Sequence, residues 1–319
     1  MLTIFKKSLY VLSAILILSS CEDEVRIDLG DHDPVLTVDA WLDNKSETQR
    51  ITLTWSTDFF ENKTLPPGVS GAEVYVIDDT GARFDFVEKS AGIYEWVSPV
   101  SGQGFGEVGR QYDLTIVTTD ATYTSSTIMK PTSPVDTVYF VNDFDPFEGD
   151  YVRADFQAQD LPTLGDTYWI KAYKNDTLLN RVGEINIAYD AGFSAGGGED
   201  QNGKTFIPPL RFEINDYSEL PLYQEGDSVY VEIHSISPEA FEFLNLLVFQ
   251  SDREAGFGAL FESPLANVTT NIKSSKEGEI ITGVFNVADV DGTGKKLVLE
   301  HVLDRGCFFN SEVEIECPE

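Results

Sequence analysis

The chain has 319 residues, and its 22 Lys and Arg against 54 Asp and Glu give a formal net charge of −32. A surface this acidic repels phosphates, so nucleic acid is excluded as a partner and anionic lipid headgroups are poor ones. Apolar residues make up 42% and charged residues 24% of the chain, which is typical of a globular protein and excludes collagen-like, coiled-coil and multi-span membrane classes. No motif fixes a biochemical reaction.

The first twenty residues predict a lipoprotein signal peptide, 1–20. Lys6 and Lys7 form a positive start, and Leu9 to Leu18 is an apolar run too short to cross a bilayer. The run ends in Leu18-Ser19-Ser20-Cys21, which resembles the lipobox of bacterial lipoproteins and makes Cys21 the predicted lipidation site. The alternatives are an ordinary secretory peptide with a chance cysteine, or a signal anchor.

Residues 21–33 are predicted to form an acidic tether. Glu22-Asp23-Glu24 resembles the surface-export signal of Bacteroidota-type lipoproteins, although a solvated tether would also be acidic. The expected location is therefore the outer membrane, with the protein held by its lipid and exposed at the cell surface if the signal acts. The protein is expected to contact the membrane through its N-terminal lipid.

The following hundred residues, 34–130, predict an immunoglobulin-like β-sandwich. Short runs with apolar and polar alternation are separated by turn residues, and their number suits a small sandwich. Tyr112 opens a late strand after Gly109, as a corner-packing Tyr does in such sandwiches, so its predicted role is structural. The predicted strands are Val35–Leu42, Arg50–Trp55, Ala72–Ile77, Arg83–Val87, Ile93–Val97, Gln111–Thr118 and Thr122–Met129.

Residues 131–135, in the Pro-rich stretch after Lys130, are predicted to be a linker, followed by a C-terminal β-sandwich domain over 136–319. Ser237, Pro238 and Glu239 suit the N-cap and first turn of one inserted α-helix over 238–251, which its apolar side chains should pack against a sheet. The predicted fold class is thus mainly β, with two sandwich domains. The strands expected in this half are Val138–Val141, Tyr151–Gln157, Tyr168–Lys174, Glu184–Tyr189, Ser228–Ile233, Glu279–Val287 and Lys296–Leu303.

The chain has three cysteines, Cys21, Cys307 and Cys317. Lipidation uses the first, which leaves an even pair in an oxidising compartment, so a Cys307–Cys317 disulfide is predicted. A metal site is the weaker alternative because no His lies close to the pair in sequence.

Two glycine motifs match catalytic or cofactor patterns without the required context. Gly104 to Gly109 spells G-x-G-x-x-G, but the next predicted element is a strand rather than the helix that a dinucleotide site needs. Gly192 to Gly196 spells G-x-S-x-G around Ser194, with Asp227 and His234 following in hydrolase order. A glycine-rich loop follows Ser194 where a helix is required, so a hydrolase is the least favoured function.

Asp289 to Gly294 hints at a calcium loop, but two carboxylates are too few, and Asp291-Gly292 between β runs favours a hairpin turn. Asp143, Asp145, Glu148 and Asp150 form a second acidic loop with the same ambiguity. The sequence therefore predicts no catalytic, cofactor-binding or metal-binding residue, and no enzyme activity is expected.

These pieces together resemble an uncharacterised domain-of-unknown-function family of Bacteroidota outer-membrane lipoproteins, often encoded beside TonB-dependent receptors. The resemblance implies a two-part β protein on the outer membrane without an established activity. It rests on Cys21, Pro34–Leu42, Val69–Val74, Tyr112–Ile116, Gly226–Ile233, the helix after Ser237-Pro238, Ser263–Val268 and Asn271-Ile272.

The expected function is a non-enzymatic accessory or binding component of a TonB-dependent uptake system, with an unidentified ligand. Sandwich-end loops present contacts on a rigid scaffold, so the candidate loops are Phe59–Gly68, Ser101–Gly109 and Asp190–Gly203. The alternative is an independent structural or adhesive surface lipoprotein.

Overall fold

The computed structural model describes residues 33–57, 65–193, 201–218, 220–251 and 268–317. It is mainly β, with 46% strand and 10% helix, which confirms the predicted class at this level. The predicted signal peptide, Cys21 and almost all of the tether lie outside the described residues.

One sheet of nine strands contains the first seven strands of the chain and is nearly closed on itself. Its strand order is β14-β7-β6-β3-β4-β5-β2-β1-β15. β4 joins its two halves because residues 83–86 pair with β3 and residues 87–90 pair with β5. The seven strands are β1 (Leu36–Asp43), β2 (Gln49–Trp55), β3 (Glu73–Asp78), β4 (Arg83–Ser90), β5 (Ile93–Trp96), β6 (Gln111–Val117) and β7 (Thr122–Ile128).

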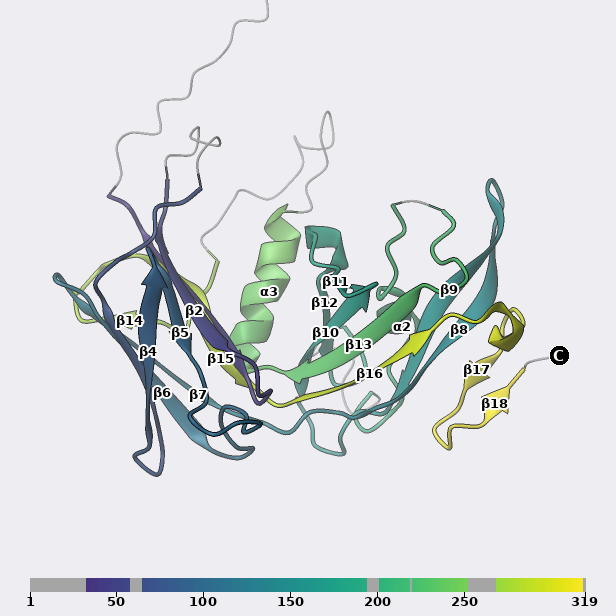
Figure 1. Ribbon diagram of the computed structural model, residues 1–319, viewed down its shortest axis with the longest axis horizontal. Helices are drawn as coiled ribbons and strands as arrows, with labels where there is room; N and C mark the ends of the chain where they lie inside the picture. The colour runs from purple at the N-terminus through teal and green to yellow at the C-terminus, as the bar shows by residue number, and fades with distance from the viewer. Residues whose placement is uncertain (1–32, 58–64, 194–200, 219, 252–267, 318–319) are drawn as a thin grey trace, which may run out of the picture. The chain divides into compact units, whose positions relative to one another are not determined.

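Strands from the C-terminal half complete this sheet (Figure 1). β15 (Ile281–Ala288) pairs in parallel with β1 along its whole length, and β14 (Lys273–Ser274) pairs with β7 at the other end. Alternate side chains of β1 and β15, among them Val38 and Phe285, point into one buried apolar core. The division of the chain at residues 131–135 stays a prediction, but the N-terminal strands do not form their sheet alone.

The remaining strands build a second core. A five-stranded sheet has the order β11-β10-β13-β16 with β12 paired to β10, and β8 pairs with β9 in a long hairpin. A short helix, α2 (Pro208–Phe212), contributes Leu210 to the core between them. The strands are β8 (Val135–Asp145), β9 (Gly149–Ala158), β10 (Thr167–Lys174), β11 (Thr177–Leu178), β12 (Asn186–Tyr189), β13 (Ser228–Ser235) and β16 (Val290–Lys296).

The predicted helix is present as α3 (Pro238–Ser251). The Ser237 hydroxyl accepts a hydrogen bond from Ala240 N at 3.1 Å, which is the predicted N-cap. Its first turns bury Ala240, Phe241 and Leu244, whereas Phe249 near its end is 62% exposed. The helix packs on β15, β10 and β12, so its apolar face covers the place where the two sheets meet (Figure 1).

The predicted hairpin turn at Asp291-Gly292 is wrong. Both residues lie inside β16, with Glu232 of β13 opposite Gly292. The Asp289 carboxylate accepts from Thr132 N at 2.9 Å and from Asn44 Nδ2, and Asp291 accepts from Val135 N at 2.7 Å. These acids therefore hold the segment after Lys130 against the sheets, a role that sequence spacing does not reveal.

The strand expected over Lys296–Leu303 is also wrong. The chain leaves β16 at Lys296 and forms a 3₁₀ turn, η4 (Leu299–His301), after which Leu303 makes a single bridge to Val141 of the hairpin. A second short 3₁₀ turn, η1 (Val182–Glu184), precedes β12 where a longer strand was expected.

The structure pairs Cys307 with Cys317, as predicted, and closes the C-terminal segment over β17 (Phe308–Phe309) and β18 (Ile315–Glu316). Phe309 packs edge-on against Tyr139 of β8, with ring centroids 4.8 Å apart. No helix among the described residues combines the length and apolar character that spanning a bilayer requires.

Gly283 tests the importance of the β1–β15 pairing. Its φ is +104°, and a Cβ there would lie 1.9 Å from Val38 O. Gly283→Ala should therefore lower the free energy of unfolding by about 3 kcal/mol or more, measured by denaturant titration. Gly278→Ala is the control, because Gly278 also has positive φ (+77°) but no atom within 4 Å of a new Cβ. Equal losses in both variants would show that backbone strain alone accounts for the effect.

Candidate binding cleft

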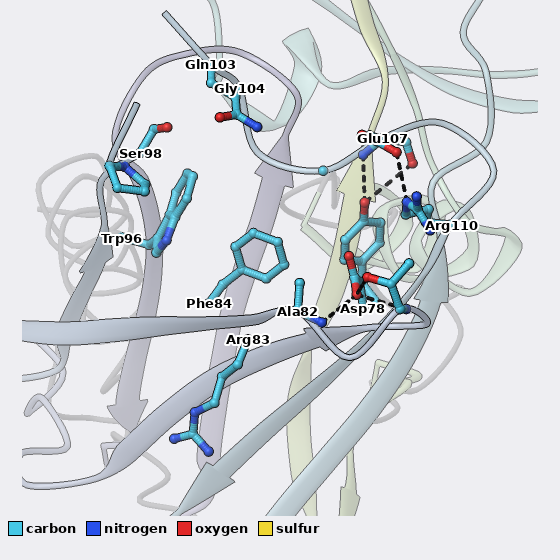
Figure 2. A pocket seen from close by; sticks show the side chains of 14 residues that line it. Asp78, Ala82, Arg83, Phe84, Trp96, Ser98, Gln103, Gly104, Glu107 and Arg110 are labelled. Carbon is cyan, nitrogen blue, oxygen red and sulfur yellow. Dashed lines mark hydrogen bonds and ion pairs between the residues drawn. The ribbon is translucent and has the colours of Figure 1, made fainter. Parts of the chain in front are cut away.

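A cleft of about 360 Å³ lies at one end of the nine-stranded sheet, lined in part by the predicted loop Ser101–Gly109. Figure 2 shows the turn between β3 and β4, the end of β5 and this loop around it. The volume falls within the range of small-molecule sites. The structure thus places this candidate loop beside a cleft.

The inner wall of the cleft is aromatic. Phe84 and Trp96 meet edge-on with ring centroids 5.6 Å apart, and both pack on Phe105 at 4.7 and 5.2 Å. Phe105 is fully buried, whereas Phe84 and Trp96 are only half-buried and line the cleft (Figure 2). Edge-on aromatic pairs fix one another's orientation, so the cleft presents a rigid apolar surface.

The glycines of the G-x-G-x-x-G pattern allow the loop to insert Phe105. A Cβ on Gly104 would lie 1.8 Å from Asn44 O, and a Cβ on Gly106 would lie 2.8 Å from the Tyr112 hydroxyl oxygen. Gly106 and Gly109 also have positive φ, +76° and +88°, which favours glycine. The motif is thus structural, and the following element, β6, is a strand as expected.

Tyr112 is structural, as predicted. Its side chain is fully buried, and its hydroxyl oxygen accepts a hydrogen bond from Glu107 N at 2.6 Å (Figure 2). Burial raises the pKa of the Tyr112 phenol, so the group stays neutral in this position. The bond attaches the cleft loop to the start of β6.

Charged side chains form the outer rim of the cleft. Arg110 pairs with Glu107 at 2.8 Å and with Asp79 at 3.2 Å. Asp78 accepts from Thr80 N at 2.9 Å and Ala82 N at 2.8 Å, which fixes the turn between β3 and β4. An apolar wall with a charged rim is suited to binding a small molecule or a protein segment.

The other candidate loops are described only in part. In Phe59–Gly68, residues 59–64 lie outside the described residues, and Gly68 makes a bridge to Thr54. In Asp190–Gly203, residues 194–200 lie outside them, and these include Ser194.

The proposed partners of Ser194 do not lie together. Asp227 immediately precedes β13 and His234 is near its other end, which separates them by roughly 23 Å along an extended strand. Asp227 accepts a hydrogen bond from Asn175, and His234 lies 2.9 Å from Glu232. A Ser–Asp–His triad built from these residues is therefore excluded by the position of its acid and base.

Sequence analysis missed a buried acidic cluster, Asp160, Asp166 and Asp190. Their carboxylates lie within 4.8 Å of one another, and each residue is at most 7% exposed. Asp160 accepts from the Tyr168 hydroxyl at 2.7 Å and Gly203 N at 2.9 Å. Asp160 and Asp166 lie in the loop between β9 and β10, and Asp190 directly follows β12, so their spacing in the sequence does not signal that all three meet.

Hydrogen bonds and ion pairs also hold the acidic loop at the β8–β9 turn. Asp145 accepts from Phe147 N and Glu148 N, Asp143 pairs with Arg153, and Asp150 pairs with Arg305. The acids of this loop therefore stabilise the turn itself.

Residues 22–293 match the family model described as a domain of unknown function, DUF4249. The chain belongs to this family. No curated protein matches the chain. The DUF4249 match covers both sheets up to β16 and ends before the disulfide-closed segment.

The acidic cluster predicts a pH dependence of stability. Burial, followed by the charges of Asp190 and Asp166, raises the pKa of Asp160 from 3.8 to about 6. The folded state therefore holds this proton more tightly than the unfolded chain, and ionisation costs stability as pH rises from about 4 to 6. The free energy of unfolding of Asp160→Asn, taken relative to that of the wild type, should therefore rise by about 1–2 kcal/mol between pH 4 and pH 7.5.

This gain is measured as the change, across pH, in the difference between the two unfolding free energies. Hydrogen bonds that the variant loses change its unfolding free energy by the same amount at pH 4 and at pH 7.5, so they cancel in this comparison. Asp304→Asn, which removes an exposed carboxyl, serves as the control. A difference that stays constant from pH 4 to 7.5 would contradict the raised pKa.

Proposed function

We propose that this DUF4249 protein is an outer-membrane lipoprotein, anchored through Cys21, that acts as a non-enzymatic binding component of a TonB-dependent uptake system. In this proposal the loop-lined cleft contacts the ligand or the receptor, and the acidic surface keeps the tethered protein soluble. The observation that carries the binding role is the aromatic cleft held open by Phe105 and the Ser101–Gly109 loop.

The anchoring part of the proposal is supported by the sequence alone. The charged start, the short apolar run and Leu18-Ser19-Ser20-Cys21 follow the order of a lipoprotein signal. The family match begins at residue 22, directly after the predicted lipidated cysteine. A lipid tether would confine the protein near membrane receptors, so that even a weak interface is occupied.

The finer fold is also a proposal: two immunoglobulin-like sandwiches, the second carrying α3. The hydrogen bond from Glu107 N to the Tyr112 hydroxyl supports it, because a Tyr in that position of such sandwiches bonds backbone a few residues upstream. Such a scaffold would give the cleft loops their fixed positions. The alternative function, an independent structural or adhesive surface protein, needs the same anchor but no receptor.

Cys21→Ala tests the anchor. The variant should carry no acyl chain and should leave the membrane fraction, because the thiol that receives the lipid is gone. Mass spectrometry of the mature N-terminus and membrane fractionation are the measurements. Sedimentation of the variant with outer membranes after high-salt and carbonate washes would refute lipid anchoring.

Co-purification tests the receptor. Affinity purification after gentle detergent extraction should recover a TonB-dependent receptor in near-equal amount. Val108→Asp should lower this recovery severalfold, since Val108 is 48% exposed on the cleft loop and a new acid would disfavour docking there. Val87→Asp, at a 56% exposed position on β4, is the matched control and should leave recovery unchanged.

Recovery of the lipoprotein alone, at native expression and after mild crosslinking, would favour the independent surface protein. If both valine variants lose the same amount of co-purified receptor, the cleft is not part of the interface. The receptor would still be supported as a partner.

A further inference from the structure

A second cleft, of about 280 Å³, lies where the outer faces of the two sheets meet. It shares no lining residue with the loop cleft. On one side it is lined by β1 and β2, and on the other by β10. The lining residues are Asp39, Trp41, Arg50, Thr52, Trp169 and Lys171.

Strand alternation brings these side chains together. In β1, Val38, Ala40 and Leu42 enter the first core, so Asp39 and Trp41 point to the opposite face. In β10, Ile170 enters the second core in the same way, and Trp169 and Lys171 point outward. Because α3 and β15 hold the sheets with these outer faces together, both sets line one cleft.

The apolar wall of this cleft is a pair of tryptophans. The rings of Trp41 and Trp169 meet edge-on with centroids 4.9 Å apart, and Trp41 also packs near Phe243 of α3 at 6.5 Å. Both indoles are half-buried, so each leaves part of its surface for another group. Aromatic pairs of this kind supply a large apolar contact area at little entropic cost.

Lys171 carries the charge at the centre of the cleft. Its ammonium nitrogen lies 4.0 Å from the centroid of the Trp169 ring, and no hydrogen bond or ion pair from the described residues reaches it. Burial lowers the pKa of Lys171 to about 8, partly offset by the nearby charges of Asp43 and Glu232. An ammonium that is desolvated but unpaired is stabilised by any anionic group that enters the cleft.

The neighbouring acidic and basic side chains largely form hydrogen bonds and ion pairs with one another. Glu232 lies 3.0 Å from the Lys45 ammonium and 2.9 Å from His234 Nε2, and burial lowers the pKa of His234 below its usual value. The neutral imidazole therefore donates to the Glu232 carboxylate at neutral pH. Lys171 remains as the cation without a hydrogen-bonded counter-ion in this group.

Asp39 supplies the opposite charge. Its carboxylate is exposed at the cleft, within electrostatic range of Lys171, and Thr52 stands opposite it in the β1–β2 pairing. Neither Asp39 nor Thr52 has a side-chain hydrogen bond to another described residue. The Arg50 guanidinium also lines the cleft, and its Nε and Nη2 donate hydrogen bonds to Glu95. A carboxylate and an ammonium without hydrogen-bond partners among the described residues thus line the same cleft as the tryptophan pair.

We propose that this cleft binds a small zwitterion that carries an amine, a carboxylate and an apolar group, namely an amino acid or a short peptide. The ligand carboxylate pairs with Lys171, its ammonium pairs with Asp39, and its apolar group packs on Trp41 and Trp169. A ligand with negative charge alone is disfavoured by Asp39, and a neutral ligand leaves the Lys171 ammonium unpaired. The cleft volume of about 280 Å³ suits a ligand of this size.

Isothermal titration of the full chain with a matched set of probes tests this binding mode. The probes are L-phenylalanine, L-leucyl-L-phenylalanine, L-phenylalanine amide, N-acetyl-L-phenylalanine and D-glucose. We expect saturable binding of one of the first two, which also separates a free amino acid from a peptide as ligand. The amide lacks the carboxylate and the acetyl compound lacks the ammonium, so each should bind about tenfold or more weakly than phenylalanine.

Two substitutions assign each end of the ligand. Lys171→Met should weaken phenylalanine binding about tenfold and abolish the preference for phenylalanine over its amide. Asp39→Asn should do the same for the preference over N-acetyl-phenylalanine. Lys174→Met is the control for charge, because Lys174 lies on the same strand with its ammonium over Tyr223 instead. Thermal unfolding of each variant establishes that it is folded.

Three results would overturn the proposal, and two of them need no variant. The first is the absence of saturable binding of both phenylalanine probes at millimolar concentration. The second is binding of D-glucose, the amide and the acetyl compound as tight as that of phenylalanine. The third is an unchanged preference for phenylalanine over its amide in folded Lys171→Met, which would place the ligand carboxylate elsewhere.

Discussion

The structure depends on one stretch of chain, residues 281–296, that belongs to both sheets. As β15 it pairs in parallel with β1, and after Asp289 it continues as β16, antiparallel to β13. Asp289 occupies the crossing point, where its carboxylate accepts from Thr132 N and Asn44 Nδ2. Asn286 reinforces the crossing because its Oδ1 accepts from Ser237 N at 2.9 Å, which attaches the start of α3. A single strand segment thus fixes the relation of the nine-stranded sheet to the second core.

This connection determines where the binding surfaces arise. A strand shared between two sheets brings their outer faces together, and side chains that would otherwise meet water are half-buried there. Trp41, Trp169 and Lys171 owe their surroundings to that geometry rather than to any local motif. The loop cleft has a different origin, since it rests on the aromatic cluster around Phe105 within the first sheet.

The sequence predicts the parts of this fold that depend on local chemistry. Apolar alternation predicts the first seven strands to within one residue, except that β4 continues three residues beyond its predicted end. Ser237-Pro238 predicts the start of α3, because strand faces and helix caps depend on neighbouring residues. The candidate loop Ser101–Gly109 lines a cleft in the structure, and its role in binding stays a prediction. Local patterns fail at Asp291-Gly292, where the turn signal is overridden: a Cβ on Gly292 would meet Val231 O at 2.7 Å, so the glycine serves close strand packing.

What the sequence cannot predict is which distant residues meet. In the sequence, Lys171 in β10 and Asp39 in β1 are separated by most strands of the first sheet, yet they line one cleft. Asp190 meets Asp160 and Asp166 only when the end of β12 packs beside the β9–β10 loop. With 54 acidic residues in the chain, the presence of any single acid does not indicate a site. The distinguishing feature of Lys171 is a buried ammonium that no hydrogen bond or ion pair from the described residues reaches. It stands over the Trp169 ring at the cleft between the sheets, and this placement is a consequence of the fold.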